Sequence, residues 1–194
     1  DAMQPGDDVF VERKTHHEGA SGLGNARCIR RIGRLVRGEC RRSDHLIARI
    51  LCIVAAWVEE DSIKERVKQA GGSVTGELCC RLAWFNFDDL DLHMHEPRGG
   101  HIYYASRVSP QSLGHLDVDM NVGANLTRTP VENIVYADID RMPVGVYSLR
   151  VHQFNRREMI DVGFEIEIDY KGKVYAMRYD RAVEGTITVA HIEK

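Results

Sequence analysis

Residues 88–104 read DDLDLHMHEPRGGHIYY, and this stretch decides the fold class. Apolar and polar side chains alternate along DLDLHMH, and the PRGG that follows is a turn sequence before the next apolar segment, HIYYAS. A period of two is typical of a strand that buries one face. The face expected in the core carries Leu90, Leu92 and Met94, and the opposite face carries Asp89, Asp91, His93 and His95.

Similar segments continue to the end of the chain, separated by turn residues such as SPQS and YKGK. No helix-length segment interrupts them, so we expect a mainly β fold, an antiparallel β-sandwich that is jelly-roll-like. The nine predicted strands are VTGELCCRLAWF, DLDLHMH, HIYYAS, GHLDVDMNV, ENIVYADI, GVYSLRVHQF, DVGFEIEIDY, KVYAMRYD and GTITVAHIE.

The chain before residue 72 has a different pattern. Residues 1–25 are rich in glycine and polar groups and predict an extended arm, whereas residues 26–71 show helical spacing and predict an N-terminal α-helical extension. The last of its helices is expected to begin at a cap formed by Asp61 or Ser62 and to stop at Gly71 and Gly72. The β-sandwich domain is then expected over residues 72–194.

Composition excludes several classes of protein. The 194 residues include 26 basic and 29 acidic side chains, a balance that argues against binding nucleic acid through overall charge. The most apolar run, residues 46–58, contains Arg49 and is too short for a membrane, where about 20 residues are needed. Five cysteines without a CxxC pair predict neither a disulfide framework nor a zinc ribbon and favour a cytoplasmic over a secreted location. Because the chain begins with Asp1, the secreted alternative stays open.

The helical extension is the segment expected to meet a partner. Eight arginines lie between residues 27 and 49, Arg30 and Arg34 among them. They predict either a solvated helix face or a surface for an acidic or phosphate-bearing partner. The broad apolar face of the same helices favours docking on a protein partner or on a second copy of the chain.

The β-strand region resembles a known family. The residues that carry the resemblance are Trp84, the segments at 89–94, 102–104, 116–119 and 130–134, and GVYSLRVHQF. In this order they are similar to the motifs of the YfaP-like bacterial β-sandwich domain family, over residues 70–190 approximately. The resemblance implies a β-sandwich module and no agreed activity. At Leu113, Gly114 and His115 the family usually has paired glycines before the LDVD strand.

A shorter resemblance lies in the N-terminal arm. VFVERKTHHEG, residues 9–19, resembles a motif of polyphosphate polymerases of the vacuolar transporter chaperone type. It implies binding of polyphosphate or another polyanion through a basic segment. A tunnel of that type needs about eight strands with inward charges, and no other predicted strand repeats the pattern.

Two acidic strands predict a metal site. The DLDL strand and the LDVD strand each carry carboxylates on a polar face, and like charges on neighbouring strands need a neutralising partner. Calcium binds six to eight oxygens and tolerates irregular geometry, so calcium is the expected ligand. The candidate ligands are Asp88, Asp89, Asp91, Asp117, Asp119 and Asn121, with Glu132 and Asn133 within reach.

Two alternatives stay open for this region. Polar residues on a solvated sheet face need no ligand at all, and a softer ion such as zinc would choose among His93, His95, His101 and His115. A metal-dependent phosphoester hydrolase is the enzymatic alternative, because carboxylates and histidine can activate water on a metal. No nucleophile motif supports an enzyme, and Ser109 and Ser112 are typical turn residues.

Taken as a whole, the sequence favours a non-catalytic β-sandwich binding or assembly module that depends on calcium. Tyr103 and Tyr104 are adjacent on a strand, so their rings are expected on opposite faces. The outward ring, Tyr104, is a candidate contact residue.

Overall fold

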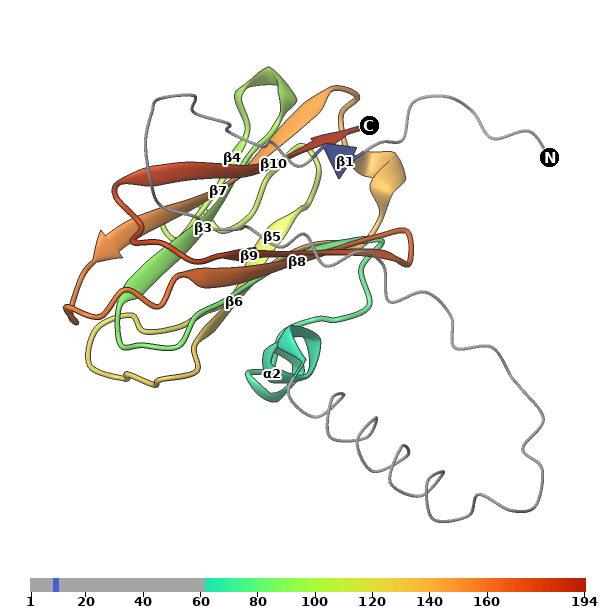
Figure 1. Cartoon of the computed structure of the whole chain (residues 1–194). Helices are drawn as coiled ribbons and strands as arrows, with labels where there is room; N and C mark the ends of the chain where they lie inside the picture. Colours follow the sequence, from blue (N-terminus) through green and yellow to red (C-terminus); the bar gives the residue numbers. More distant parts are fainter. Residues whose placement is uncertain (1–8, 11–61) are drawn as a thin grey trace, which may run out of the picture.

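The computed structural model describes residues 9–10 and 62–194 (Figure 1). Most of the predicted arm, most of the predicted helical extension, Arg30 and Arg34 therefore lie outside the described residues. In the described part, no helix is long and apolar enough to cross a bilayer.

The described chain is mainly β. The strands are β1 (Val9–Phe10), β2 (Leu78–Ala83), β3 (Asp89–His95), β4 (His101–Ile102), β5 (His115–Asp119), β6 (Val131–Tyr136), β7 (Val146–Asn155), β8 (Phe164–Tyr170), β9 (Lys173–Tyr179) and β10 (Thr186–Glu193). Each of the nine predicted segments overlaps one of β2 to β10, so the strand prediction is confirmed. Two short 3₁₀ turns, η1 (Pro97–Gly99) and η2 (Ile139–Arg141), follow β3 and β6.

Among the described residues one helix, α2 (Ile63–Gln69), lies between β1 and β2 in the chain. The side chain of Ser62 accepts a hydrogen bond from the Glu65 backbone N–H, which is the predicted N-cap. Gly71, with φ of 87°, follows the helix in the left-handed region and ends it as expected. Ile63 and Val67 are the buried residues of the helix and pack against β2 and β6.

The strands form two antiparallel sheets. Sheet A has the order β1-β10-β7-β3-β4, and sheet B has the order β5-β6-β2-β8-β9. Their facing sides share one hydrophobic core, which contains Leu92 and Leu149 from sheet A and Ile134 and Ile166 from sheet B. The predicted inward residues of β3, Leu90, Leu92 and Met94, all lie in this core.

Strand β4 is much shorter than predicted, and this opens the edge of β3. The predicted strand covers residues 101–106, but only His101 and Ile102 pair with β3, opposite His95 and Met94. The chain then turns at once, because Tyr103 and Ser106 exchange two backbone hydrogen bonds of 3.2 and 3.0 Å. The part of β3 before Met94 therefore pairs with β7 on one side and with no strand of the described chain on the other.

The loop between β4 and β5 is held by a buried carboxylate. Glu96 is 5% exposed and accepts hydrogen bonds from the hydroxyls of Ser109 (2.6 Å), Ser112 (2.5 Å) and Tyr136 (3.0 Å). Ser109 and Ser112 also accept backbone N–H groups within their own turn, as predicted for turn residues. This network ties the loop that leads into β5 to Glu96, directly after β3, and to Tyr136 at the end of β6.

A β-bulge in β5 changes the side-chain orientation that strict alternation along the LDVD segment predicts. The register against β6 shifts between Leu116 and Val118. Leu116 lies in the core between the sheets, whereas Val118 packs with α2 on the opposite side of sheet B. The expectation that these two residues share a face, with Asp117 and Asp119 together on the other, is wrong because the extra residue reverses the alternation.

Candidate functional site

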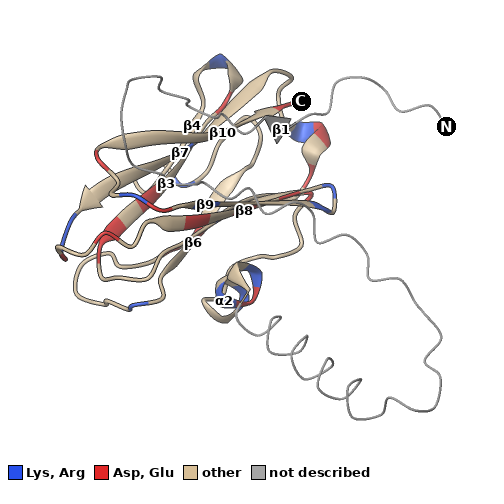
Figure 2. Ribbon diagram, viewed as in Figure 1, with Lys and Arg blue, Asp and Glu red and all other residues tan. Residues whose placement is uncertain are grey.

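Three carboxylates meet where the open edge of β3 approaches β5 and β6. Asp91 comes from sheet A, and Asp119 and Glu132 come from sheet B, where they lie opposite each other in the β5–β6 register. One carboxylate oxygen from each lies within 4.8 Å of the others. We call Asp91, Asp119 and Glu132 the carboxylate cluster; Figure 2 shows the acidic segments along β3.

The cluster is largely removed from water. Glu132 is 1% exposed and Asp91 is 4% exposed. One oxygen of Glu132, Oε2, has a hydrogen-bond donor. The short β4 leaves the Leu92 backbone N–H without a strand partner, and this N–H donates to Glu132 Oε2 at 2.5 Å. Three further oxygens, Asp91 Oδ2, Asp119 Oδ1 and Glu132 Oε1, are buried and accept no hydrogen bond within the described chain. Buried acceptors of this kind cost free energy unless a proton or a cation is shared among them.

The electrostatics of the cluster favour an added positive charge. Burial, followed by the negative charge of Asp119, raises the pKa of Glu132 well above its usual value. Burial is also the main cause of the raised pKa values of Asp119 and of neighbouring Asp89. Each shift shows that the ionised carboxylate is disfavoured where it stands.

Two arginines offset part of this charge. The Arg157 guanidinium lies 3.1 Å from Asp89 Oδ2, and the Arg107 guanidinium lies 3.3 Å from Asp119 Oδ2. Four carboxylates against two guanidinium groups leave two negative charges uncompensated when all are ionised. Sequence reasoning missed both arginines, because Arg157 lies 68 residues from Asp89, Arg107 lies in a loop 12 residues before Asp119, and no local pattern connects either pair.

A hard divalent cation fits the donor set. The three residues offer only oxygen ligands, and they come from strands held in register by two different sheets. Calcium and magnesium both choose carboxylate oxygens, but calcium accepts a larger and less regular set, including bidentate carboxylates. The residues present could therefore hold calcium, with Glu132 as the most deeply buried ligand.

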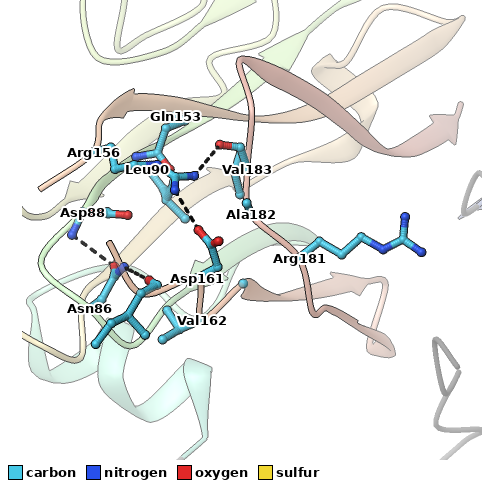
Figure 3. Close-up of a pocket in the computed structure, with 12 residues that line it drawn as sticks. Asn86, Asp88, Leu90, Gln153, Arg156, Asp161, Val162, Arg181, Ala182 and Val183 are labelled. Carbon is cyan, nitrogen blue, oxygen red and sulfur yellow. Dashed lines mark hydrogen bonds and ion pairs between the residues drawn. The ribbon is translucent and has the colours of Figure 1, made fainter. Parts of the chain in front are cut away.

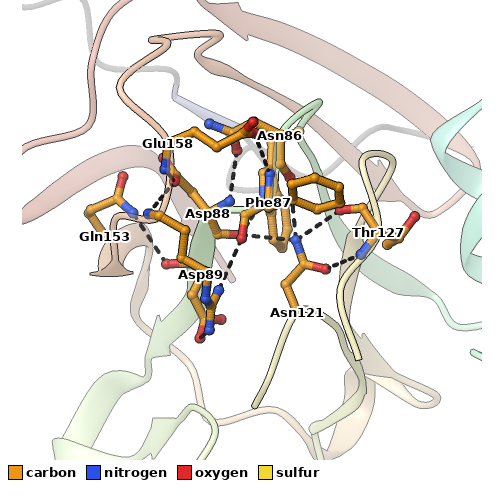
Figure 4. A network of polar contacts seen from close by, with 10 residues as sticks. Asn86, Phe87, Asp88, Asp89, Asn121, Thr127, Gln153 and Glu158 are labelled. Atoms are coloured by element: carbon orange, nitrogen blue, oxygen red, sulfur yellow. Dashed lines mark hydrogen bonds and ion pairs between the residues drawn. The ribbon is translucent and has the colours of Figure 1, made fainter. Parts of the chain in front are cut away.

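Asp88 and Asn121, two other predicted ligands, have structural partners instead (Figure 4). Asp88 Oδ1 accepts the backbone N–H groups of Arg157 (2.7 Å) and Glu158 (2.9 Å). Asn121 Nδ2 donates to the Asp88 carbonyl at 3.0 Å, and Asn121 Oδ1 accepts from the Thr127 N–H at 2.8 Å. These contacts tie three loops together at one end of the sheets, and neither side chain joins the carboxylate cluster.

Asp117 and Asn133 lie on the side of sheet B that faces α2. Asp117 Oδ2 accepts the Ser73 N–H at 2.6 Å, and Asp117 Oδ1 accepts from Asn133 Nδ2 at 2.7 Å. Asn133 Nδ2 also donates to the Ser73 carbonyl at 3.0 Å. The pair thus holds the connection between α2 and β2, and the bulge separates Asp117 from Asp119.

Histidines gather beside the carboxylates. His93, His95 and His101 form the histidine cluster, with one ring nitrogen of each within 4.8 Å of the others. His93 Nε2 lies 3.9 Å from Asp91 Oδ2, which joins the two clusters. His115, another predicted candidate for zinc, instead places Nδ1 3.3 Å from the Leu113 carbonyl and belongs to neither cluster.

Aromatic rings continue the same surface. Tyr104 is 45% exposed and meets Tyr103 and Phe154 edge to face, at 5.1 and 5.4 Å between ring centroids. Phe154 is 55% exposed. Tyr104 is exposed as predicted, but the expectation that the two tyrosine rings lie on opposite faces is wrong. The chain turns at Tyr103, so this ring stacks on the outward rings of His93 and His101 and also contacts Tyr104. Tyr103, Tyr104 and Phe154 form a small aromatic patch.

A hollow between the β2–β3 and β7–β8 loops has little room for a ligand (Figure 3). Arg156 crosses it, donating to Asp161 Oδ1 at 2.8 Å and to the Val183 carbonyl at 3.4 Å. The enclosed space holds about one water molecule. The carboxylate and histidine clusters are therefore the better candidates for chemistry.

A scan against protein-family models found no match to the chain, and searches of curated proteins and of solved structures found none. The function must therefore be argued from these two clusters.

Proposed function

We propose that the chain is a jelly-roll-like β-sandwich module that binds calcium through Asp91, Asp119 and Glu132 and serves in non-catalytic binding or assembly. The observation that carries the proposal is the meeting of three carboxylates, from two different sheets, with buried oxygens that accept no hydrogen bond in residues 62–194. A proton shared between Asp119 and Glu132 would satisfy one pair of oxygens only. A divalent cation would contact all three residues and balance the two uncompensated charges.

A cation at this position would act as a cross-link. Asp91 belongs to sheet A, whereas the other two ligands belong to sheet B. Binding would hold the two sheets together where the short β4 leaves β3 without a strand neighbour on one side. The nearby aromatic patch of Tyr103, Tyr104 and Phe154 offers a contact surface for a macromolecular partner.

The test is thermal unfolding with calcium against chelator. A ligand at about 100 times its dissociation constant adds roughly 2.7 kcal/mol to the free energy of unfolding. For a chain of this size we expect calcium to raise the melting temperature by about 5 to 10 °C. The Glu132→Gln and Asp119→Asn variants should lose this shift, since each removes a charged ligand.

Matched controls are available on the exposed surface. Glu165 and Asp180 pair with Arg178 away from the cluster, so Glu165→Gln and Asp180→Asn should keep the full calcium shift. Equal melting temperatures of the unsubstituted protein in calcium and in chelator, at millimolar calcium, would reject the proposal. So would a shift that survives both Glu132→Gln and Asp119→Asn.

A second candidate function is metal-dependent hydrolysis of phosphoesters. One observation favours it: Asp91 connects the carboxylates to His93, so acidic and imidazole groups share one surface. Ser109 and Ser112 supply no nucleophile, since both donate to Glu96, and both described cysteines are buried, so the hydrolase would depend on metal-bound water. The binding module is therefore the preferred function.

A further inference from the structure

We propose that His93, His95 and His101 form a separate site for a borderline transition metal such as zinc, on the outer face of sheet A. This site uses different ligands and a different class of metal from the carboxylate cluster, so it does not depend on the calcium proposal.

Sheet geometry brings the three side chains together. His93 and His95 are two residues apart on β3, and His101 pairs directly with His95 from β4. Their neighbours Leu92, Met94 and Ile102 lie in the core. Because side chains alternate across a strand, the three histidines project from the opposite face of the sheet, where cross-strand partners lie about 5 Å apart at Cβ.

The ring nitrogens lie close together. His93 Nδ1 lies 3.0 Å from His101 Nε2, and one ring nitrogen of each of the three histidines lies within 4.8 Å of the others. The rings of His95 and His101 stack at 4.1 Å between centroids, and because an imidazole lone pair lies in the ring plane, His95 would turn out of this stack to ligate the same metal. Two imidazole nitrogens at 3.0 Å can share one hydrogen, but the third histidine has no comparable hydrogen bond within the cluster. A metal would instead accept a lone pair from each of the three rings.

Groups around the rings would orient them. Asp91 Oδ2 lies 3.9 Å from His93 Nε2, on the side of that ring away from His101. A carboxylate beside the second nitrogen of a ligating histidine is a common device for fixing the ring and raising its basicity. Tyr103 stacks on His101 at 4.2 Å and on His93 at 5.4 Å, which restricts ring rotation.

The donor set selects the metal. Imidazole nitrogen suits zinc, copper and nickel, whereas calcium and magnesium choose oxygen. Cys79 and Cys80 are on β2 of sheet B and add no thiolate to this set. Three histidine nitrogens leave the fourth position of a tetrahedral metal for water. Catalytic zinc sites share this arrangement of three protein ligands and one water.

The experiment is a titration of the chelator-treated full chain with cobalt, in which visible absorption measures binding. Tetrahedral cobalt absorbs strongly in the visible range and reports nitrogen ligation, and zinc should displace it. We expect one cobalt per chain. His95→Gln and His101→Gln should each weaken binding by on the order of tenfold or more, as should Asp91→Asn through its effect on His93.

The control variants separate this site from others. His115→Gln removes a histidine outside the cluster and should leave cobalt binding unchanged. Glu132→Gln should also bind cobalt normally, even when it has lost its response to calcium. Melting curves of His95→Gln and His101→Gln in chelator show whether each variant is folded. Absence of the visible bands in the unsubstituted protein, or bands of equal strength in a folded His101→Gln variant, would overturn the proposal.

Discussion

Glu132 Oε2, on β6 of one sheet, accepts a hydrogen bond from the backbone N–H of Leu92, on β3 of the other sheet, at 2.5 Å. The side chain of Glu132 thus takes the place that a longer β4 would have filled. The second oxygen of the same carboxylate points to the cluster with Asp91 and Asp119. One residue therefore closes the sheet edge and supplies the most buried candidate ligand.

Substitutions at Glu132 should separate these two roles. Glu132→Ala leaves the Leu92 N–H without its acceptor, so we expect a loss of about 1 to 3 kcal/mol in the free energy of unfolding. Glu132→Gln keeps an oxygen for Leu92 and removes a buried charge, so in chelator it should be at least as stable as the unsubstituted protein. Urea denaturation in chelator measures the free energy of unfolding of both variants and of the unsubstituted protein. Equal destabilisation by the two variants would show that the hydrogen bond to Leu92 contributes nothing specific.

The pH dependence of stability in chelator should reveal the raised pKa of Glu132. The folded protein holds this proton to a higher pH than the unfolded chain, in which a glutamate has a pKa of about 4.3. Between those two pKa values the folded state binds more protons than the unfolded state, so the free energy of unfolding falls as pH rises. Asp89 and Asp119, whose pKa values are also raised, act in the same direction.

Glu132→Gln removes the largest part of this effect. We expect the difference in unfolding free energy between Glu132→Gln and the unsubstituted protein to grow in favour of the variant as pH rises above about 4.3. Urea titrations at a series of pH values in chelator measure it. A difference that stays constant with pH would show that Glu132 ionises in the folded protein as it does in the unfolded chain.

The two aspartates of the LDVD segment should behave differently. Asp117 accepts hydrogen bonds from Ser73 and Asn133 and holds the α2–β2 connection. Asp117→Asn places an amide donor among these donors, so we expect a loss of about 1 to 3 kcal/mol with the calcium shift retained. Asp119→Asn should lose the calcium shift. Melting curves of both variants, with calcium and with chelator, measure the calcium shift of each. A shift that is lost in Asp117→Asn and kept in Asp119→Asn would mean that calcium binds on the α2 side of sheet B.

Hydrolysis should be absent if the chain is a binding module. We expect the zinc- or manganese-loaded protein to cleave a generic phosphodiester, such as bis-p-nitrophenyl phosphate, no faster than the His95→Gln variant under the same conditions. Release of p-nitrophenol measures the rate. An excess rate that disappears in both His95→Gln and Asp91→Asn would establish the hydrolase instead.

Much of the fold follows from local sequence patterns. The alternation in segments such as FEIEIDY matches β8, where Phe164, Ile166 and Ile168 are buried and the residues between them are not. The cap at Ser62 and the left-handed Gly71 also follow from local chemistry, because each depends on a few neighbouring residues. Strand positions and the end of the helix were predictable for this reason.

The candidate site was predictable only in part. Asp91, Asp119 and Glu132 were all among the predicted residues, but so were Asp88, Asp117 and Asn121, whose hydrogen bonds lie elsewhere. The bulge separates Asp117 from Asp119, the early turn at Tyr103 opens the edge of β3 beside Asp91, and loop contacts hold Asp88 and Asn121. None of these features interrupts the alternating pattern, so no local signal marked them.

The sequence by itself therefore determined which segments are strands, which residues of most strands are buried, and where the carboxylates and histidines lie along the chain. These properties depend on a period of two and on turn residues, which act over a few positions. Only the tertiary structure decided that the DLDL and LDVD strands belong to different sheets and meet at their edges. The two strands meet because two sheets pack around one core and because β4 stops after two residues. The sheet packing and the length of β4 both depend on contacts between residues far apart in the chain.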